Sequence, residues 1–182
     1  INLPVQCGDE AVLKKMNRHY TISHYLGRVQ KIRELLQPVS ITTDIIIGFS
    51  GETEEHFQST AKIMGDVGYD MAYLNKYSPR PGTVSARKYP DDVSQEEKER
   101  REKVLNDILK GTALQRNKQF VGQTVRVLVD EVKPTESGLF INTGKTDLFK
   151  NTRFSSARSY MGQFVQVKVS DVEPFGMAGD LV

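Results

Sequence analysis

The stretch SITTDIIIGFSGET, residues 40–53, decides the fold of the first half of the chain. Ser40 to Ile47 is rich in β-branched residues and ends in three consecutive isoleucines, which is typical of a strand covered on both faces in a parallel sheet. The glycine-containing segment that follows predicts a turn, and a helix capped by Thr53 should then run to Val67. A strand, a turn and a helix in direct succession indicate an α/β fold.

Similar units lie on either side of this stretch. Leu3 to Gln6 reads as the end of a preceding strand, and Met71 to Tyr77 reads as a following one. Between the strands, Asp9 and Thr21 are placed to cap two helices. Because ligands bind at the carboxyl ends of parallel strands, we expect a functional site where the turns after these strands meet.

The second half of the chain has a different pattern. Ser94-Gln95-Glu96-Glu97 is a capping-box sequence and predicts a charged helix that runs toward Gln119 as a connector. From Val121 onward, valines alternate with polar residues, and glycines at 122, 138, 144, 162, 176 and 179 predict turns between short strands. These features indicate a small closed barrel of the oligonucleotide-binding (OB) type. The predicted parts are therefore residues 1–93, 94–119 and 120–182.

Composition limits the chemistry that the chain can perform. It has 182 residues, a net charge of +2 and a single cysteine, Cys7. One thiol cannot hold an iron–sulfur cluster, which needs three or four, and the three histidines lack metal-ligand spacing, so we predict no metal site. No apolar run approaches the roughly 20 residues that span a bilayer, which predicts a soluble, cytoplasmic protein without a membrane partner. Since the chain begins without methionine, we expect it to be a portion of a longer protein.

Four motifs together resemble a known family. They are LPVQ (residues 3–6), KKMNRHYT (14–21), DIIIGFSGET (44–53) and YSPRPGT (77–83). The set closely resembles the carboxyl-terminal part of the radical S-adenosylmethionine (SAM) methylthiotransferases, and the tRNA-modifying branch is the nearest. The last barrel is similar in length and position to the TRAM domain, a small RNA-binding barrel. The resemblance implies the carboxyl-terminal half of a six-stranded radical SAM βα barrel followed by an all-β, OB-like TRAM barrel.

The resemblance also implies a SAM site at the strand ends. Arg18 would pair with the methionyl carboxylate, Gln6 would face the cofactor, and the strand and turn ending at Gly48 would contact the adenosine. Arg80 stands between two prolines that stiffen its backbone, which suits a fixed contact with a carboxylate or phosphate. The predicted cofactor-binding residues are Gln6, Arg18, Asp44, Gly48, Glu52, Tyr77 and Arg80. From the residues alone, a solvated arginine, a satisfied strand-end glutamine and an ordinary turn remain open alternatives.

The barrel carries the predicted RNA contacts. Basic residues interleaved with aromatics suit single-stranded RNA, because they neutralise phosphates and stack on bases. The predicted contacts are Lys145, Phe149, Lys150, Arg153 and Arg158, with only Asp147 opposing the cations. Gly144-Lys145-Thr146 resembles a turn of tRNA-directed TRAM domains. From residue 120 onward, however, seven basic residues face seven acidic ones, so a solvated loop with core aromatics remains open.

The implied activity is insertion of a methylthio group into an adenosine beside the tRNA anticodon. Its partners would be the anticodon stem-loop and the amino-terminal part of the same protein. That part would supply the cysteines for the 4Fe–4S clusters, so we predict no catalytic residue within this chain and no activity for the chain alone. Two alternatives are a ribosomal-protein methylthiotransferase and a non-enzymatic RNA-binding adaptor. The βα half argues against the adaptor, which has no need of a cofactor site.

Overall fold

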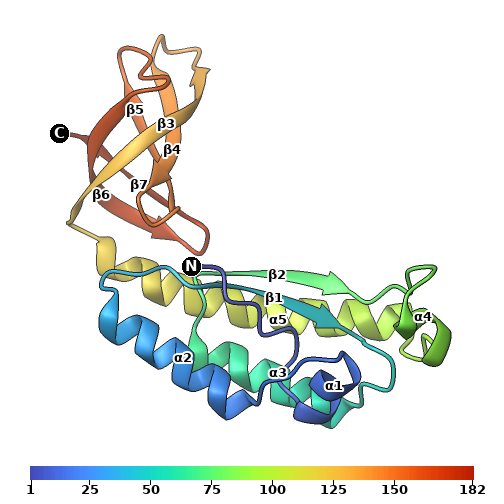
Figure 1. Cartoon of the computed structure of the whole chain (residues 1–182). Helices are drawn as coiled ribbons and strands as arrows, with labels where there is room; N and C mark the ends of the chain where they lie inside the picture. The colour runs from blue at the N-terminus through green and yellow to red at the C-terminus, as the bar shows by residue number, and fades with distance from the viewer. The chain divides into compact units, whose positions relative to one another are not determined.

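The computed structural model describes all residues from 1 to 182 and separates them into two compact units, Ile1–Leu109 and Lys110–Val182 (Figure 1). The boundary falls inside the long helix α5 (Gln95–Asn117). The boundary between the units coincides with neither end of the predicted connector, residues 94–119. Leu105 and Leu109 of that helix are buried in the core of the first unit. None of the helices is long and apolar enough to cross a membrane.

The first unit is built on a small parallel sheet. Strands β1 (Thr42–Ile47) and β2 (Met71–Lys76) pair in parallel over their whole lengths. Residues 1–6 run parallel to β1 on its other edge, with isolated bridges at Asn2 and Gln6. This segment is less regular than the predicted strand, because the N–H of Val5 donates to the hydroxyl of Thr43 (2.9 Å) instead of to a backbone carbonyl.

Five α-helices accompany these strands: α1 (Glu10–Lys15), α2 (Ile22–Leu35), α3 (Glu54–Val67), α4 (Val84–Lys88) and the first part of α5. The predicted caps are confirmed, since the side chains of Asp9, Thr21 and Thr53 accept backbone N–H groups at the helix starts. Helix α4 was not predicted. It follows the turn at residues 80–83 and is capped by Thr83.

The sheet is covered on one face only. Ile45 and Ile47 are buried in a core to which α2, α3 and α5 all contribute. On the opposite face Asp44 and Ile46 are half-buried, and Tyr73 of β2 is 54% exposed. The prediction from the three isoleucines, that both faces are covered, is therefore wrong for this chain. The open face leads directly to the turns at the carboxyl ends of the strands.

The second unit is a closed five-stranded barrel, preceded by a 3₁₀ turn, η1 (Lys118–Phe120). Its strands are β3 (Thr124–Pro134), β4 (Phe140–Thr146), β5 (Asn151–Ser156), β6 (Phe164–Glu173) and β7 (Gly176–Leu181). They follow the order β3-β4-β5-β7-β6, and β3 pairs with β6 to close the barrel. The predicted OB-like barrel is confirmed, with β5 and β7 as strands that the pattern did not reveal.

Two of the predicted turn glycines lie inside strands. A Cβ atom on Gly144 of β4 would stand 2.1 Å from the carbonyl oxygen of Leu128, and one on Gly179 of β7 would stand 2.1 Å from that of Lys168. Each glycine lies beside a β-bulge of the neighbouring strand. They therefore permit the close approach of two backbones, and they do not end strands.

Candidate cofactor site and nucleic-acid interface

Two adjoining hollows open at the carboxyl ends of β1 and β2. One, of about 290 Å³, contains Phe49, Tyr77 and Arg80, and we call it the aromatic hollow. The other, of about 470 Å³, has a rim of basic residues, and we call it the basic hollow. The two share Ile46, Phe49 and Ser85, so they form one continuous cleft. This is the edge of the sheet at which a site was predicted.

The aromatic hollow is shaped by two rings in contact. The rings of Phe49 and Tyr77 meet edge to face, with centroids 4.8 Å apart and planes at 62°. The hydroxyl of Tyr77 is hydrogen-bonded to Ser85 of α4, which fixes the ring against that helix. At the rim, the carbonyl of Arg80 accepts from the Thr83 hydroxyl (2.8 Å), which leaves an exposed guanidinium on a constrained backbone. Such a hollow suits a flat ring system.

The basic hollow gathers cations from two helix ends. Lys14 and Lys15 lie in the last turn of α1, and Lys88 lies in the last turn of α4. Asn17, with φ of 59°, lies just beyond the end of α1, and Arg18 follows it into the hollow. No carboxylate is among the residues that line this hollow. The excess of positive charge suits an anionic ligand group such as a carboxylate.

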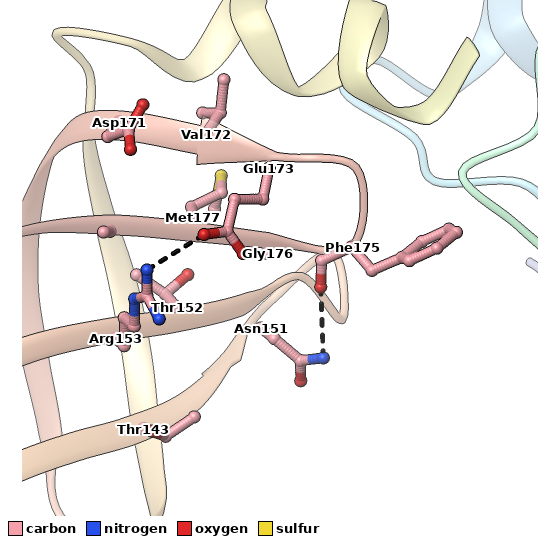
Figure 2. Close-up of a pocket in the computed structure, with 11 residues that line it drawn as sticks. Thr143, Asn151, Thr152, Arg153, Asp171, Val172, Glu173, Phe175, Gly176 and Met177 are labelled. Carbon is pink, nitrogen blue, oxygen red and sulfur yellow. Dashed lines mark hydrogen bonds and ion pairs between the residues drawn. The ribbon is translucent and has the colours of Figure 1, made fainter. Parts of the chain in front are cut away.

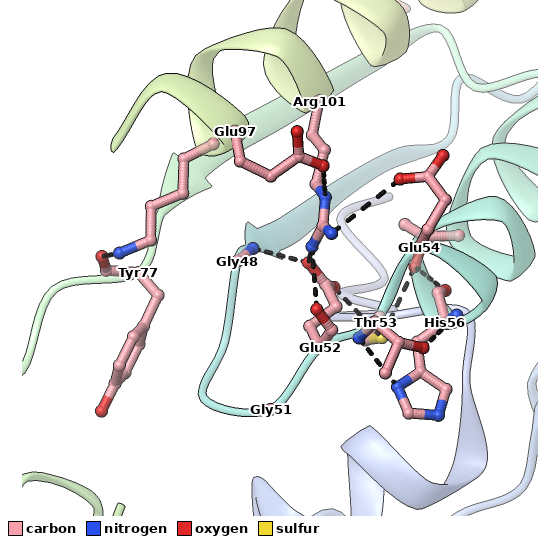
Figure 3. A network of polar contacts seen from close by, with 12 residues as sticks. Gly48, Gly51, Glu52, Thr53, Glu54, His56, Tyr77, Glu97 and Arg101 are labelled. Atoms are coloured by element: carbon pink, nitrogen blue, oxygen red, sulfur yellow. Dashed lines mark hydrogen bonds and ion pairs between the residues drawn. The ribbon is translucent and has the colours of Figure 1, made fainter. Parts of the chain in front are cut away.

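A buried ion pair supports the loop between β1 and α3 (Figure 3). The carboxylate of Glu52 accepts the N–H of Gly48 (2.7 Å) and Nη1 of Arg101 from α5 (2.7 Å). The same Nη1 also donates to the backbone carbonyl of Glu52 (3.1 Å), while Nε of Arg101 binds Glu97 (2.7 Å). Burial raises the pKa of Glu52, although Arg101 and the N–H of Gly48 oppose this effect.

Lys98 of α5 joins the loops after both strands. Its Nζ donates to the carbonyl of Tyr77 (3.0 Å) and forms an ion pair with Asp91 (2.5 Å). Its aliphatic part covers Gly48, where a Cβ atom would stand 2.5 Å from the Lys98 side chain and where φ is 69°. The side chain of Lys98 is only 3% exposed. Helix α5 thus holds the walls of the cleft through Lys98 and Arg101.

The predicted cofactor residues occupy three kinds of position. Arg18, Tyr77 and Arg80 line the cleft. Gly48 and Glu52 lie in the network behind it, where Lys98 and Arg101 engage them.

The remaining two predicted residues line neither hollow. Asp44, on the open face of the sheet, accepts from the side-chain amide of Asn2 (3.0 Å). Gln6 is 9% exposed and has a φ of 64°.

Several residues of the cleft were not predicted. Phe49 and Ser85 lie between the two hollows, and Lys98 and Arg101 support the walls. The sequence did carry a signal for the two cations, because residues 98, 101, 105 and 109 follow one another at helical spacing and therefore share one stripe with two leucines. A cation on an apolar stripe indicates a buried partner.

The residues of the cleft fit SAM, which carries a carboxylate and an adenine ring. They do not fit an iron–sulfur cluster. Cys7 is fully buried and lies close to Thr60 and Glu52, and burial raises the pKa of its thiol to about 11. No group of three His, Cys, Asp or Glu side chains is placed to hold a metal ion.

The predicted RNA-binding residues lie mainly on the β4–β5 hairpin. Lys145 and Arg153 point outward from the barrel, and Lys145 donates to the side chain of Asn151 (2.7 Å). Phe149 occupies the hairpin turn with φ of 60° and is 81% exposed. The guanidinium of Arg158, in the loop after β5, lies 4.7 Å from the ring centre of Tyr160.

The prediction that Lys150 contacts RNA is corrected by its burial. Its side chain is largely covered, with only 8% of the residue exposed, so it does not offer RNA an exposed contact.

Acidic residues distant in sequence also reach this surface. Arg153 forms an ion pair with Glu173 of β6 (3.0 Å), which corrects the prediction that only Asp147 opposes the basic group. Asp147 itself pairs with Arg126 of β3 (2.9 Å), whose guanidinium lies 4.8 Å from the ring centre of Phe164. That hydrogen bond raises the pKa of Arg126.

Comparisons with known proteins match both halves of the chain. Residues 1–64 match the Radical SAM superfamily, and residues 118–182 match the TRAM domain. Over 129 residues the chain is 50% identical to the tRNA-2-methylthio-N(6)-dimethylallyladenosine synthase of Thermus thermophilus, a match that covers 71% of this chain and 28% of that protein.

Two more distant relatives carry the same name. The protein of Flavobacterium psychrophilum is 46% identical over 138 residues, which cover 75% of this chain and 29% of that protein. The protein of Ehrlichia chaffeensis is 40% identical over 149 residues, which cover 81% of this chain and 33% of that protein. The chain thus spans about 28 to 33% of the length of these relatives.

Proposed function

We propose that this chain, which belongs to the radical SAM methylthiotransferases, forms the carboxyl-terminal part of an enzyme that inserts a methylthio group into an adenosine of tRNA. One observation carries the proposal. A cleft with a basic and an aromatic half lies at the carboxyl ends of parallel strands. The same chain contains an OB-type barrel with basic and aromatic side chains on its surface. A cofactor cleft alone would suit many enzymes, and a barrel alone would suit an adaptor.

The chain's role toward the cofactor is binding and orientation. Arg18, with the lysines of the basic hollow, would pair with the methionyl carboxylate, and Phe49 and Tyr77 would contact the adenine. SAM, when bound there, would supply the radical chemistry. The cluster that delivers the electron would be held by cysteines outside this chain.

The chain's role toward the substrate is to hold RNA on the barrel. Lys145 would neutralise a phosphate, Arg153 would contact the RNA from the neighbouring strand, and Phe149 offers an exposed ring on which a base can stack. We propose that the barrel binds the anticodon stem-loop of tRNA, because an unpaired loop presents bases that can stack on such a surface. The enzyme would act in the cytoplasm.

Two variants separate these roles in the enzyme that contains this chain. Arg18→Ala should weaken SAM binding roughly tenfold to a hundredfold, since it removes a charge-assisted contact worth about 1.5 to 3 kcal/mol. It should leave tRNA binding unchanged. Lys145→Ala should do the reverse: it should weaken tRNA binding and reduce the slope of log affinity against log salt by about one unit or less.

Calorimetric titration with SAM and filter binding of tRNA at several salt concentrations measure both effects. If Lys145→Ala left the tRNA affinity and its salt slope unchanged, the barrel would lose its proposed role, and a protein substrate would become the better reading. If Arg18→Ala left SAM binding unchanged, the basic hollow would not be the carboxylate site.

A further inference from the structure

We propose that a second cavity, on the barrel, binds one unpaired guanine base of the RNA. This inference rests on the proposed RNA-binding function and specifies which base the barrel recognises and with which side chains. None of the predicted RNA contacts except Arg153 belongs to this cavity.

The cavity lies where the barrel is least tightly closed (Figure 2). Strands β5 and β7 pair in parallel over only two residue pairs, Thr152 with Met177 and Arg153 with Ala178. Beside this short seam, β5 and the β6–β7 hairpin enclose about 270 Å³. In OB folds the second and third strands and the loop between the fourth and fifth strands form the nucleic-acid face, and this cavity lies there. Its volume is below the roughly 300–1,000 Å³ of pockets for drug-sized ligands, so it suits a part of a nucleotide.

The charges around the cavity favour a base over a phosphate. Its charged groups are the guanidinium of Arg153 and the carboxylates of Asp171 and Glu173. Two carboxylates against one cation repel a phosphate, whereas they accept hydrogen bonds from the N–H groups of a base.

The pairing of Arg153 with Glu173 selects guanine among the bases. The two side chains are joined at 3.0 Å and are 57% and 61% exposed, so they present guanidinium donors and carboxylate acceptors side by side to an incoming edge (Figure 2). Guanine offers two neighbouring donors, N1–H and the 2-amino group, next to the O6 acceptor. The carboxylate can accept from both donors while the guanidinium donates to O6. Adenine, cytosine and uracil do not present two neighbouring donors on this edge.

The cavity wall is held in place before any ligand binds. Asn117, which is 1% exposed, donates its side-chain amide to the carbonyls of Glu173 (2.8 Å) and Pro174 (3.1 Å). Asn151 donates to the carbonyl of Phe175 (3.4 Å) from the other side. Fixing the hairpin backbone lowers the entropy lost when Glu173 binds a base.

Phe175 has a separate role at the mouth of the cavity. Its ring is 39% exposed and is directed away from the Arg153–Glu173 pair (Figure 2). It therefore leaves the pair accessible and offers a surface on which an adjacent base can stack.

The test uses the whole chain and labelled uridine-rich single-stranded RNAs that differ at one central position. Guanosine, inosine or adenosine is placed there, and dissociation constants are measured by fluorescence anisotropy. Inosine retains O6 and N1–H but lacks the 2-amino group. Wild-type protein should bind the guanosine RNA about 10- to 100-fold more tightly than the inosine RNA, the effect of one hydrogen bond to a charged group.

Three variants identify the source of this preference. Glu173→Gln should bring the guanosine and inosine affinities together, because the amide has one acceptor oxygen and an NH2 donor in place of the two acceptor oxygens of the carboxylate. Asp130→Asn is the matched control, an exposed carboxylate of β3 that does not line the cavity, and should keep the full preference. Phe175→Leu should weaken binding of every RNA about 5- to 150-fold and leave the guanosine-to-inosine ratio unchanged.

The possible results are distinct. Equal wild-type affinities for guanosine and inosine RNAs, or a preference retained in Glu173→Gln, would overturn the guanine assignment while the proposed function stood. Absence of any RNA binding by the wild-type chain would overturn both. Because Glu173 is exposed, the circular dichroism and melting temperature of Glu173→Gln should match the wild type, which shows that any loss of preference is not unfolding.

Discussion

Replacement of Arg101 by methionine should destabilise the first unit in a pH-dependent way. Arg101 is 5% exposed and makes contacts with Glu52 and Glu97 that methionine cannot make. The variant leaves the Glu52 carboxylate, 2% exposed, with the N–H of Gly48 and no cation. Removing one partner of a buried ion pair costs about 3 to 5 kcal/mol, so we expect a loss of this order at pH 8.

The pH dependence follows from the proton on Glu52. Burial already raises the pKa of this carboxyl from 4.5, and the loss of Arg101 should raise it further. A carboxyl with a raised pKa binds its proton more tightly in the folded state than in the unfolded chain. Stability is therefore retained at and below pH 4.5 and decreases as pH rises, by up to about 1.4 kcal/mol per pH unit. The variant should thus be much closer to the wild type at pH 5 than at pH 8.

Urea unfolding followed by the helical circular dichroism signal, at pH 5 and pH 8, measures both quantities. Arg100→Met is the matched control, since Arg100 lies one residue away on α5 and its side chain is 46% exposed. Arg100→Met should lower the free energy of unfolding only slightly, and this loss should not increase with pH. If Arg101→Met lost the same free energy of unfolding at both pH values, or no more than Arg100→Met loses, either result would refute the conclusion that the buried ion pair supports the cleft.

Three further predictions concern single residues. Gly48→Ala should lower the melting temperature, because alanine is strained at a φ of 69° and its Cβ would meet the Lys98 side chain. Gly82→Ala is the control, since Gly82 also has a positive φ but no atom lies near the position of an added Cβ. Glu97→Gln should destabilise the protein at pH 6 and less at pH 3, since the hydrogen bond from Arg100 lowers the pKa of Glu97 to about 2, and stability that depends on its charge is lost as pH falls from 4.5 toward 2. Cys7 should react with iodoacetamide at pH 8 far more slowly in the native protein than in urea, because its thiol is buried with a pKa of about 11; equal rates would contradict its burial.

Local patterns predicted most of the first unit because its elements begin and end with local signals. Thr53 caps α3 where its position before the acidic first turn predicted it, and β1 follows its run of β-branched residues. The same reasoning missed β7, since Gly176 to Leu181 contains two glycines and does not alternate. That strand is specified by the close approach of Lys168 to Gly179, a contact between strands that the pattern of one strand does not contain.

The site was less predictable because it depends on which distant residues meet. Arg18 and Arg80 stand in the cleft, as their motifs indicated. Lys98, however, reaches Tyr77 and covers Gly48 only because α5 packs against the sheet, and Glu173 reaches Arg153 only because the barrel closes. Both contacts join segments about twenty or more residues apart, so the pattern of neither segment alone contains them.

Mass spectrometry can test whether the enzyme that contains this chain places a methylthio group on tRNA, as we propose. The intact enzyme that contains this chain is incubated anaerobically with SAM, a reductant and a sulfur source, together with tRNA and ribosomal proteins in one reaction. The tRNA is then digested to nucleosides, the proteins are digested to peptides, and both are analysed. We expect a methylthio-adenosine derivative from the tRNA and unmodified ribosomal peptides. A methylthio group on a ribosomal peptide, with unmodified tRNA, would identify a ribosomal-protein methylthiotransferase instead.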